Sequence, residues 1–206
     1  MSVDWSALVL ALGVAAAAPG SDPARDWAPM RFGDKAATEY RHVRDRNGAI
    51  VEAHCHDSAS GLIRREPVDL ARTPILSWRW RTDRIYSGID EQTRDGDDFP
   101  LRVYVVRDGG WRVWRTRAVI YVWSGAEAGP DHWASPYTDR AHVFVVRRGA
   151  AGVGEWQHET RDVAQDFRTA FGEAPERVDG VAVMSDCDGA GPGGVSAYGG
   201  LHWSTP

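Results

Sequence analysis

The sequence has 206 residues, a net charge of −5 and a pI near 5.8. This length is enough for one domain with a substantial core. Positive charge is spread through an acidic chain, which argues against nucleic-acid binding and against binding to an anionic membrane, since both need a basic patch. Ten tryptophans are the unusual feature. Each needs a large pocket and a partner for its N–H, so we expect an aromatic core with a few rings left for binding.

The chain begins with a continuous apolar run, residues 7–18, that ends in small residues. The run is too short to span a bilayer comfortably. It is typical of a secretory signal, with Ala16-Ala17-Ala18 as the cleavage site, although the preceding segment has Asp4 and no basic residue. The alternative is an N-terminal helix that frays. We therefore expect residues 1–18 to be a signal peptide, the protein to be periplasmic or secreted, and the mature chain to lack a transmembrane segment.

Residues 19–26 form a predicted linker, and residues 27–206 a single β-sandwich domain. Short runs with β-propensity recur between turns rich in Gly, Pro and Asn, which favours a sandwich or a barrel. The predicted strands are Met30–Phe32, Glu39–Arg44, Ala49–His56, Ile75–Arg81, Leu101–Arg107, Ala118–Trp123, His142–Arg147, Glu155–Arg161, Val178–Met184 and Ser196–Trp203.

Three of these strands are predicted to lie side by side: Ile75–Arg81, Leu101–Arg107 and Ala118–Trp123. Side chains alternate along a strand, so one face of the three would be aliphatic and the other would carry Arg and aromatic rings. Rings offer an apolar platform and Arg forks bind hydroxyls or carboxylates, which together suit a sugar. The alternative is a buried layer of Arg stacked on aromatic rings. The candidate ligand-binding residues on this face are Arg79, Arg102, Tyr104, Tyr121 and Trp123, with Arg81 beside them.

Two predicted loops are acidic: one has Asp95, Asp97 and Asp98, and the other, just before the final strand, has Asp186 and Asp188. Carboxylates separated by small residues suit a structural Ca²⁺, which takes six to eight oxygen ligands. The same loops allow a glycan-cleaving enzyme, because such enzymes need two carboxyl groups across the scissile bond. The candidate catalytic residues would then be Asp97 or Asp98 with Asp186 or Asp188. The alternative is that these residues form Asx-turns and pair with nearby Arg.

Histidine and cysteine leave further possibilities open. His54 and His56 would share one strand face, where both could contact one metal, but surface or core histidines are the simpler interpretation. Cys55 and Cys187 are the two cysteines, and they could form a disulfide in an exported protein or remain two buried thiols.

One segment has helical rather than alternating periodicity. Val163, Phe167, Ala170 and Phe171 recur at helical spacing, preceded by Asp162 and followed by Gly172. Asp is a favoured N-cap residue and Gly a favoured residue after a helix. The sequence therefore predicts one short helix, Asp162–Phe171, at an end of the sandwich.

An ordered set of motifs carries a family resemblance across about residues 27–203. The set is Ser58-Ala59-Ser60-Gly61-Leu62, Trp78-x-Trp80, Asp97-Asp98, Leu101 to Val106, Tyr121-Val122-Trp123, Ser135-Pro136-Tyr137, Asp166-Phe167-Arg168-x-x-Phe171-Gly172, Met184-Ser185-Asp186-x-Asp188 and Ala197-Tyr198. It resembles the bacterial exported family catalogued as domain of unknown function 3047. The resemblance implies a galactose-binding-like jelly roll, the fold of many carbohydrate-binding modules, and makes a structural Ca²⁺ more plausible. Gly200 stands where the family pattern leads us to expect an Asp.

Three functional hypotheses follow from these features. The leading one is an exported, non-catalytic protein that binds a glycan or polysaccharide through aromatic and Arg side chains. The second is a glycan-cleaving hydrolase or lyase that uses the paired Asp residues. The third is a structural envelope protein whose aromatic layer is only core.

Overall fold

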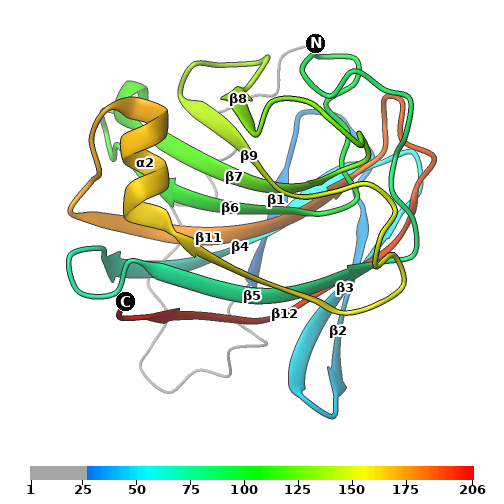
Figure 1. Cartoon of the computed structure of the whole chain (residues 1–206), viewed down its shortest axis with the longest axis horizontal. Helices are drawn as coiled ribbons and strands as arrows, with labels where there is room; N and C mark the ends of the chain where they lie inside the picture. Colours follow the sequence, from blue (N-terminus) through cyan, green and yellow to red (C-terminus); the bar gives the residue numbers. More distant parts are fainter. Residues whose placement is uncertain (1–26) are drawn as a thin grey trace.

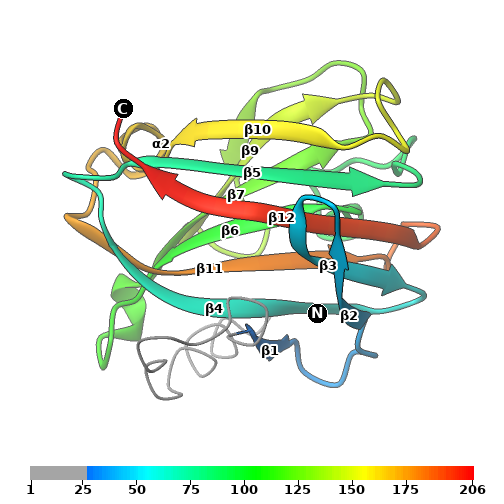
Figure 2. The same cartoon turned by 90° about the horizontal axis from the view of Figure 1, so that it is seen from below.

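The computed structural model describes residues 27–206, so the expected signal peptide (1–18) and linker (19–26) lie outside the described residues. The described chain forms two β-sheets packed face to face (Figures 1 and 2). The larger sheet has the spatial order β1 (Trp27–Arg31), β4 (Ala59–Asp69), β11 (Arg177–Asp186), β6 (Arg102–Arg107), β7 (Arg117–Ser124), β9 (Ala141–Arg148) and β8 (His132–Ala134). The smaller has the order β10 (Gln157–Asp162), β5 (Ile75–Thr82), β12 (Gly194–Ser204), β3 (Gly48–Cys55) and β2 (Glu39–Asp45). The predicted all-β sandwich of jelly-roll type is confirmed.

The main core lies between the two sheets and is rich in aromatic rings. Trp78 and Trp80 of β5 meet Tyr121 and Trp123 of β7, and all four are at most 2% exposed. Trp78 stacks on Tyr121 with ring centroids 5.3 Å apart. The indole N–H of Trp80 bonds to Glu159 at 3.1 Å and that of Trp123 bonds to a backbone carbonyl at 2.9 Å. These two indoles are buried without leaving their N–H groups unpaired, whereas the buried N–H of Trp78 has no hydrogen-bond partner in the protein.

The predicted shared face of Arg and aromatic residues is wrong. β5, with Arg79 and Arg81, belongs to the other sheet. In the β6–β7 pair Tyr104 lies opposite Ile120, so Tyr121 projects toward the opposite side of the sheet from Tyr104. β6 therefore has β11 and β7 as its neighbours, and the three predicted strands do not form a common Arg–aromatic face.

Two strands of the larger sheet were not predicted, β4 and β8. β4 is long, yet its sequence has Gly61 near its start and then Arg64-Arg65-Glu66-Pro67, which hides any alternation. Its first half is buried because β1 and β11 pair with it on both edges. β8 has only three residues and depends on pairing with β9. Tertiary pairing, rather than local propensity, makes both segments strands.

The predicted helix is confirmed as α2 (Val163–Phe171). The Asp162 carboxylate accepts a hydrogen bond from the Gln165 N–H at 2.9 Å, as expected for an N-cap. Gly172 ends the helix with φ of 81°, a left-handed conformation that favours glycine. The helix packs at one end of the sandwich beside β7 and β10 (Figure 1).

Cys55 and Cys187 form a disulfide, which decides the alternative left open by the sequence. Cys55 ends β3 in the smaller sheet, and Cys187 follows β11 of the larger sheet. The bond therefore ties the two sheets together at one end of the sandwich and anchors the segment that follows β11. Within the described part of the chain, no helix combines the length and apolarity needed to cross a bilayer.

We expect the double variant Cys55→Ala/Cys187→Ala to unfold at lower urea concentration than the wild type. The two cysteines are 132 residues apart. In the chain-entropy model, a disulfide that closes a loop of this size stabilises the folded state by about 4 to 5 kcal/mol, because it restricts the unfolded chain. Urea unfolding followed by circular dichroism measures the difference. Dithiothreitol should lower the midpoint of the wild type and leave that of the variant unchanged; equal midpoints for the two oxidised proteins would contradict the expectation.

Candidate functional site

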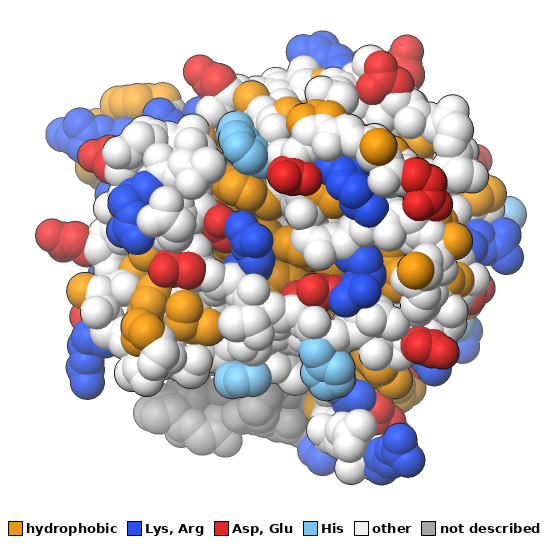
Figure 3. All heavy atoms as spheres, viewed as in Figure 1, with side chains coloured by type: hydrophobic (Ala, Val, Ile, Leu, Met, Phe, Trp, Pro, Cys, Tyr) orange, Lys and Arg blue, Asp and Glu red, His pale blue; other side chains and the backbone are white. Residues whose placement is uncertain are grey.

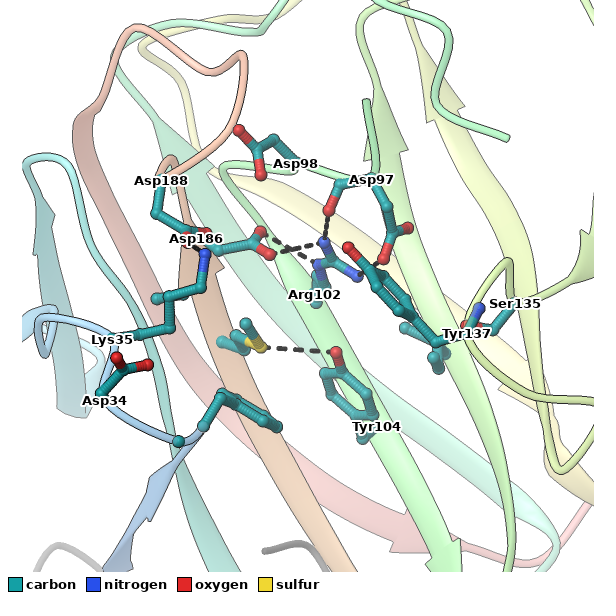
Figure 4. A pocket seen from close by; sticks show the side chains of 15 residues that line it. Asp34, Lys35, Asp97, Asp98, Arg102, Tyr104, Ser135, Tyr137, Asp186 and Asp188 are labelled. Atoms are coloured by element: carbon teal, nitrogen blue, oxygen red, sulfur yellow. Dashed lines mark hydrogen bonds and ion pairs between the residues drawn. The ribbon is translucent and has the colours of Figure 1, made fainter. Parts of the chain in front are cut away.

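The two acidic loops meet at one end of the larger sheet and form a pocket. β6 and β11 are antiparallel neighbours, and Arg102 at the start of β6 lies opposite Met184 near the end of β11. The loop before β6 and the loop after β11 therefore leave the sheet at the same edge. Together with the segments before β2 and after β8, they enclose a cavity of about 130 Å³ (Figure 4). This acidic pocket is lined by Phe32, Gly33, Asp34, Lys35, Ala59, Asp97, Asp98, Arg102, Tyr104, Ile120, Ser135, Tyr137, Met184, Asp186 and Asp188.

Arg102 is the centre of the pocket and is only 3% exposed. Its guanidinium contacts both oxygens of Asp186, with Nε 3.1 Å from Oδ1 and Nη2 2.6 Å from Oδ2. On its other side Nη1 donates to Oδ2 of Asp97 at 3.1 Å, and Nη2 donates to the backbone carbonyl of Asp97. Figure 4 shows the guanidinium between the two acidic side chains. The guanidinium is thus held by Asp186 on one side and Asp97 on the other, through charge-assisted hydrogen bonds with defined geometry.

Burial raises the pKa of both carboxyl groups that flank Arg102. The pKa of Asp186 rises to about 7, because desolvation and the nearby charges of Asp98 and Asp97 outweigh the attraction of Arg102 and the hydrogen bond from the Phe99 N–H. Desolvation also raises the pKa of Asp97. Arg102 stays charged, because the two acidic neighbours outweigh its own desolvation.

Asp98 anchors the loop after β11 instead of facing a partner Arg. Its Oδ2 accepts three backbone N–H bonds, from Gly189 at 3.0 Å, Ala190 at 2.7 Å and Gly191 at 2.7 Å. Successive amides that converge on one anion form a nest. The disulfide at Cys187 holds the same loop from its other end. Asp98 therefore fixes one wall of the pocket.

Lys35, Ser135 and Tyr137 are pocket residues that the sequence did not single out as a site. Lys35, from the segment between β1 and β2, forms an ion pair with Asp188. The Tyr137 hydroxyl donates to the Arg94 carbonyl at 2.7 Å. The sequence offered one indication that Lys35 is special, because it is the only lysine among 24 basic residues. Ser135 and Tyr137 belong to a motif of the family resemblance, but no chemical pattern in the sequence linked them to the acidic loops.

Residues 25–202 match the family described as "Protein of unknown function (DUF3047)". The chain belongs to this family. No curated protein matches the chain in sequence.

Solved structures with a similar fold include two endoglucanases. One is a metagenome-derived glycoside hydrolase family 12 endoglucanase, with 9% identity, 88% of this chain and 96% of that chain covered, and a TM-score of 0.51. The other is endoglucanase Cel12A from Rhodothermus marinus, with 8% identity, 88% and 92% covered, and a TM-score of 0.50. A family 11 carbohydrate-binding module from Clostridium thermocellum matches with 8% identity, 88% of each chain covered and a TM-score of 0.45. At these identities the similarity concerns the fold alone.

The other predicted ligand-binding residues lie away from the acidic pocket. Tyr104 joins Arg102 in it, but Tyr121 and Trp123 are fully buried between the sheets. Arg79 is buried on β5, where it pairs with Asp45 at 2.8 Å and stacks 4.3 Å over Trp156. Of the predicted group, only Arg102 and Tyr104 share a cavity.

Two other arginines cover the aromatic core where the sheets separate at β9 and β10. Arg147 stacks 5.3 Å from the Trp123 ring and pairs with Glu159 at 2.9 Å. Arg161 stacks 5.7 Å from the Tyr121 ring and pairs with Asp166. Figure 3 shows this side of the molecule, with basic and acidic side chains beside one another over apolar atoms. The arrangement corresponds to the alternative of Arg stacked on rings as part of the core, with arginines from different strands.

Among the described residues, one group of acidic or histidine side chains has the spacing of a metal site, namely Asp98, Asp186 and Asp188. Asp95 and Asp97 lie outside it, and no histidine takes part. The three carboxylates fit Ca²⁺ poorly, because each already accepts hydrogen bonds or an ion pair from protein N–H groups. Lys35 and Arg102 also place positive charge where a cation would bind. A calcium ion would have to displace these donors to gain its six to eight oxygen ligands.

We expect calcium to leave the stability of the protein unchanged. A cation that bound the folded state would raise the midpoint of unfolding with increasing concentration. Urea unfolding in millimolar CaCl₂ and in EDTA should give the same midpoint, because amide, Lys and Arg N–H groups of the protein already occupy the three carboxylates. A calcium-dependent rise in midpoint that disappears in Asp188→Asn would contradict this and support the structural Ca²⁺ expected from the sequence.

We expect the stability that Asp186 contributes to fall as the pH rises. The pKa of Asp186 is raised from 3.8 to about 7 by folding, so the folded state binds more protons than the unfolded state between these values. The free energy of unfolding must then decrease with pH across this window. The measurement is urea unfolding of the wild type and Asp186→Asn at intervals from pH 4 to 8. The free energy of unfolding of the wild type, relative to that of Asp186→Asn, should decrease with pH up to about pH 7 and then stay constant. A difference that does not change with pH would contradict the raised pKa.

Proposed function

We propose that this protein binds a glycan without cleaving it, with one terminal sugar ring in the acidic pocket. The observation that carries the proposal is the Oδ1 atom of Asp97, a buried acceptor that has no hydrogen-bond partner in the protein. A buried carboxylate oxygen without a donor is costly. A hydroxyl group of a bound sugar would supply the missing donor.

The remaining walls suit the same ligand. Phe32, Tyr104 and Tyr137 line the pocket together with Ile120 and Met184, so apolar and ring surface faces the acidic groups. A sugar ring has hydroxyls at its edge and C–H groups on its faces, which match this combination. Most ligand sites are of this kind, with apolar lining and a few fixed polar groups.

The size of the cavity favours the end of a chain over its middle. The cavity of about 130 Å³ is similar to an apolar cavity of about 150 Å³ that holds one benzene ring. The cavity is therefore too small for a run of several sugars. We infer that the pocket recognises a terminal residue, with the rest of the glycan outside.

The position of Arg102 favours binding over cleavage. Glycoside hydrolases place the scissile bond between two carboxyl groups. Here the guanidinium of Arg102 fills the space between Asp97 and Asp186 and bonds to both. Asp98 is likewise held by three amides. The raised pKa of Asp186 would suit a general acid, but the side chain is fixed by Arg102 and is only 5% exposed.

The fold is compatible with this proposal and does not by itself carry it. Two proteins with a similar fold are endoglucanases, so the same sandwich serves proteins that act on glucans. The proposed site differs from the platform expected from the sequence, because it lies at an end of the sandwich and uses acceptors more than stacked tryptophans.

We expect Asp97→Asn to weaken glycan binding by about tenfold or more. In this variant the amide oxygen can still accept from Arg102, while the amide N–H₂ replaces the free acceptor and faces the sugar hydroxyl with a second donor. Binding is measured on a panel of oligosaccharides immobilised through their reducing ends, with the same sugars tested in solution for cleavage. Near-ultraviolet circular dichroism checks that the variant is folded.

Asp131→Asn is the matched control, because its side chain is 88% exposed and lies outside the pocket. It should bind as the wild type does. Shortening of a sugar by the wild type would favour the enzyme hypothesis. Absence of binding to every sugar, or equal binding by Asp97→Asn, would contradict the proposal and favour a structural role.

A further inference from the structure

The segment from the last residue of β6 to the first residue of β7, residues 107–117, exposes two large apolar side chains. Trp111 is 78% exposed and Trp114 is 57% exposed, and these are the exposed large hydrophobic side chains among the described residues. The same protein buries Trp78, Trp80 and Trp123 almost completely. Apolar residues exposed together at a loop tip indicate an interaction surface.

This Trp–Arg loop is also locally basic. Residues 107–117 contain four arginines and one aspartate, a net charge of +3 in a chain whose total is −5. The Arg112 guanidinium lies 4.4 Å over the Trp111 ring. Arg107, Arg115 and Arg117 line a hollow beside the loop. This local concentration of arginines stands out in a chain whose positive charge is otherwise spread, although Glu173 also lines the hollow.

The loop has a defined structure. The Gly109 N–H donates to the Thr116 hydroxyl at 3.1 Å, and the Asp108 N–H donates to the carboxylate of Asp179 on β11 at 2.8 Å. A Cβ at Gly109 would lie 2.2 Å from the Arg112 carbonyl oxygen, so the close approach requires glycine. These bonds fix the backbone at residues 108 and 109, beside the exposed rings.

The two exposed indoles are perpendicular, with an interplanar angle of 89° and centroids 6.0 Å apart. Perpendicular rings cannot both lie flat against one sugar chain. Indoles do, however, favour the interface between lipid headgroups and acyl chains, and arginine side chains beside them attract anionic headgroups. We propose that the Trp–Arg loop binds the surface of an anionic lipid bilayer, with Trp111 and Trp114 inserted at the interface.

The fold places this surface far from the acidic pocket. β6 begins at Arg102 in the pocket and ends at Arg107 in the loop, so a strand of about 20 Å separates them. Figure 2 shows the loop in green at the lower left, beyond the ends of the neighbouring strands. A protein bound through the loop would hold the pocket away from the bilayer and open to its ligand. The lipid proposal does not depend on what the pocket binds.

The test is fluorescence quenching of the full chain by vesicles of phosphatidylglycerol and brominated phosphatidylcholine in equal parts. Wild type and Trp111→Phe/Trp114→Phe are compared, because their difference isolates the fluorescence of the two loop indoles from that of the other eight tryptophans. We expect this difference signal to be quenched at least twofold by the anionic vesicles. Vesicles without phosphatidylglycerol should quench it less, and added salt should reverse the effect.

The charge requirement is tested with Arg112→Glu/Arg115→Glu, which should need at least tenfold more lipid for the same quenching. Arg41→Glu/Arg44→Glu is the matched control, since both are exposed arginines on β2 and the change in net charge is the same. A difference signal that the anionic vesicles do not quench would overturn the proposal. So would equal quenching with and without anionic lipid, or binding of the loop to an acidic polysaccharide without any quenching by vesicles.

Discussion

The acidic pocket at the end of the larger sheet depends on one buried cation, the guanidinium of Arg102. Arg102 is taken out of water at the first residue of β6, and a buried charge is tolerated only when its partners are close and well oriented. Asp186 from the end of β11 and Asp97 from the preceding loop supply these partners. Loss of Arg102 would leave two buried carboxylates without their cation, which costs about 3 to 5 kcal/mol, whereas loss of either aspartate leaves the guanidinium with the other as its partner. The ion pairs of Arg102 with Asp97 and Asp186 therefore connect β6 and β11 to the loop before β6 and fix these side chains relative to one another.

The geometry of these ion pairs also limits what the pocket does. The acidic loops supply the carboxylates that hydrolysis of a glycan requires, yet the guanidinium lies between two of them and amides hold a third. What remains free is an acceptor on Asp97, surrounded by rings and aliphatic groups. In the proposed function this acceptor contacts a sugar hydroxyl, and the position of Arg102 between two of the carboxylates argues against cleavage by them.

The two ends of the larger sheet carry contrasting chemistry. One end has four aspartates that accept hydrogen bonds and ion pairs, and the other has exposed tryptophans among arginines. Both sets lie in loops whose backbones are fixed by hydrogen bonds, glycines or the disulfide. A sandwich separates such loops by the length of its strands, so a protein of this size can contact two different partners at once.

The sequence by itself determined the alternation within the predicted strands, the sandwich class and the limits of the helix. These depend on neighbours along the chain: Asp162 and Gly172 cap the helix through bonds within one turn. The neighbours of each strand were decided only by the tertiary structure. Register places Tyr104 opposite Ile120 and sends Tyr121 to the other face, and β5 belongs to the second sheet. Pairing between distant segments also brought Lys35 to Asp188, because 153 residues separate them and no local pattern encodes their contact.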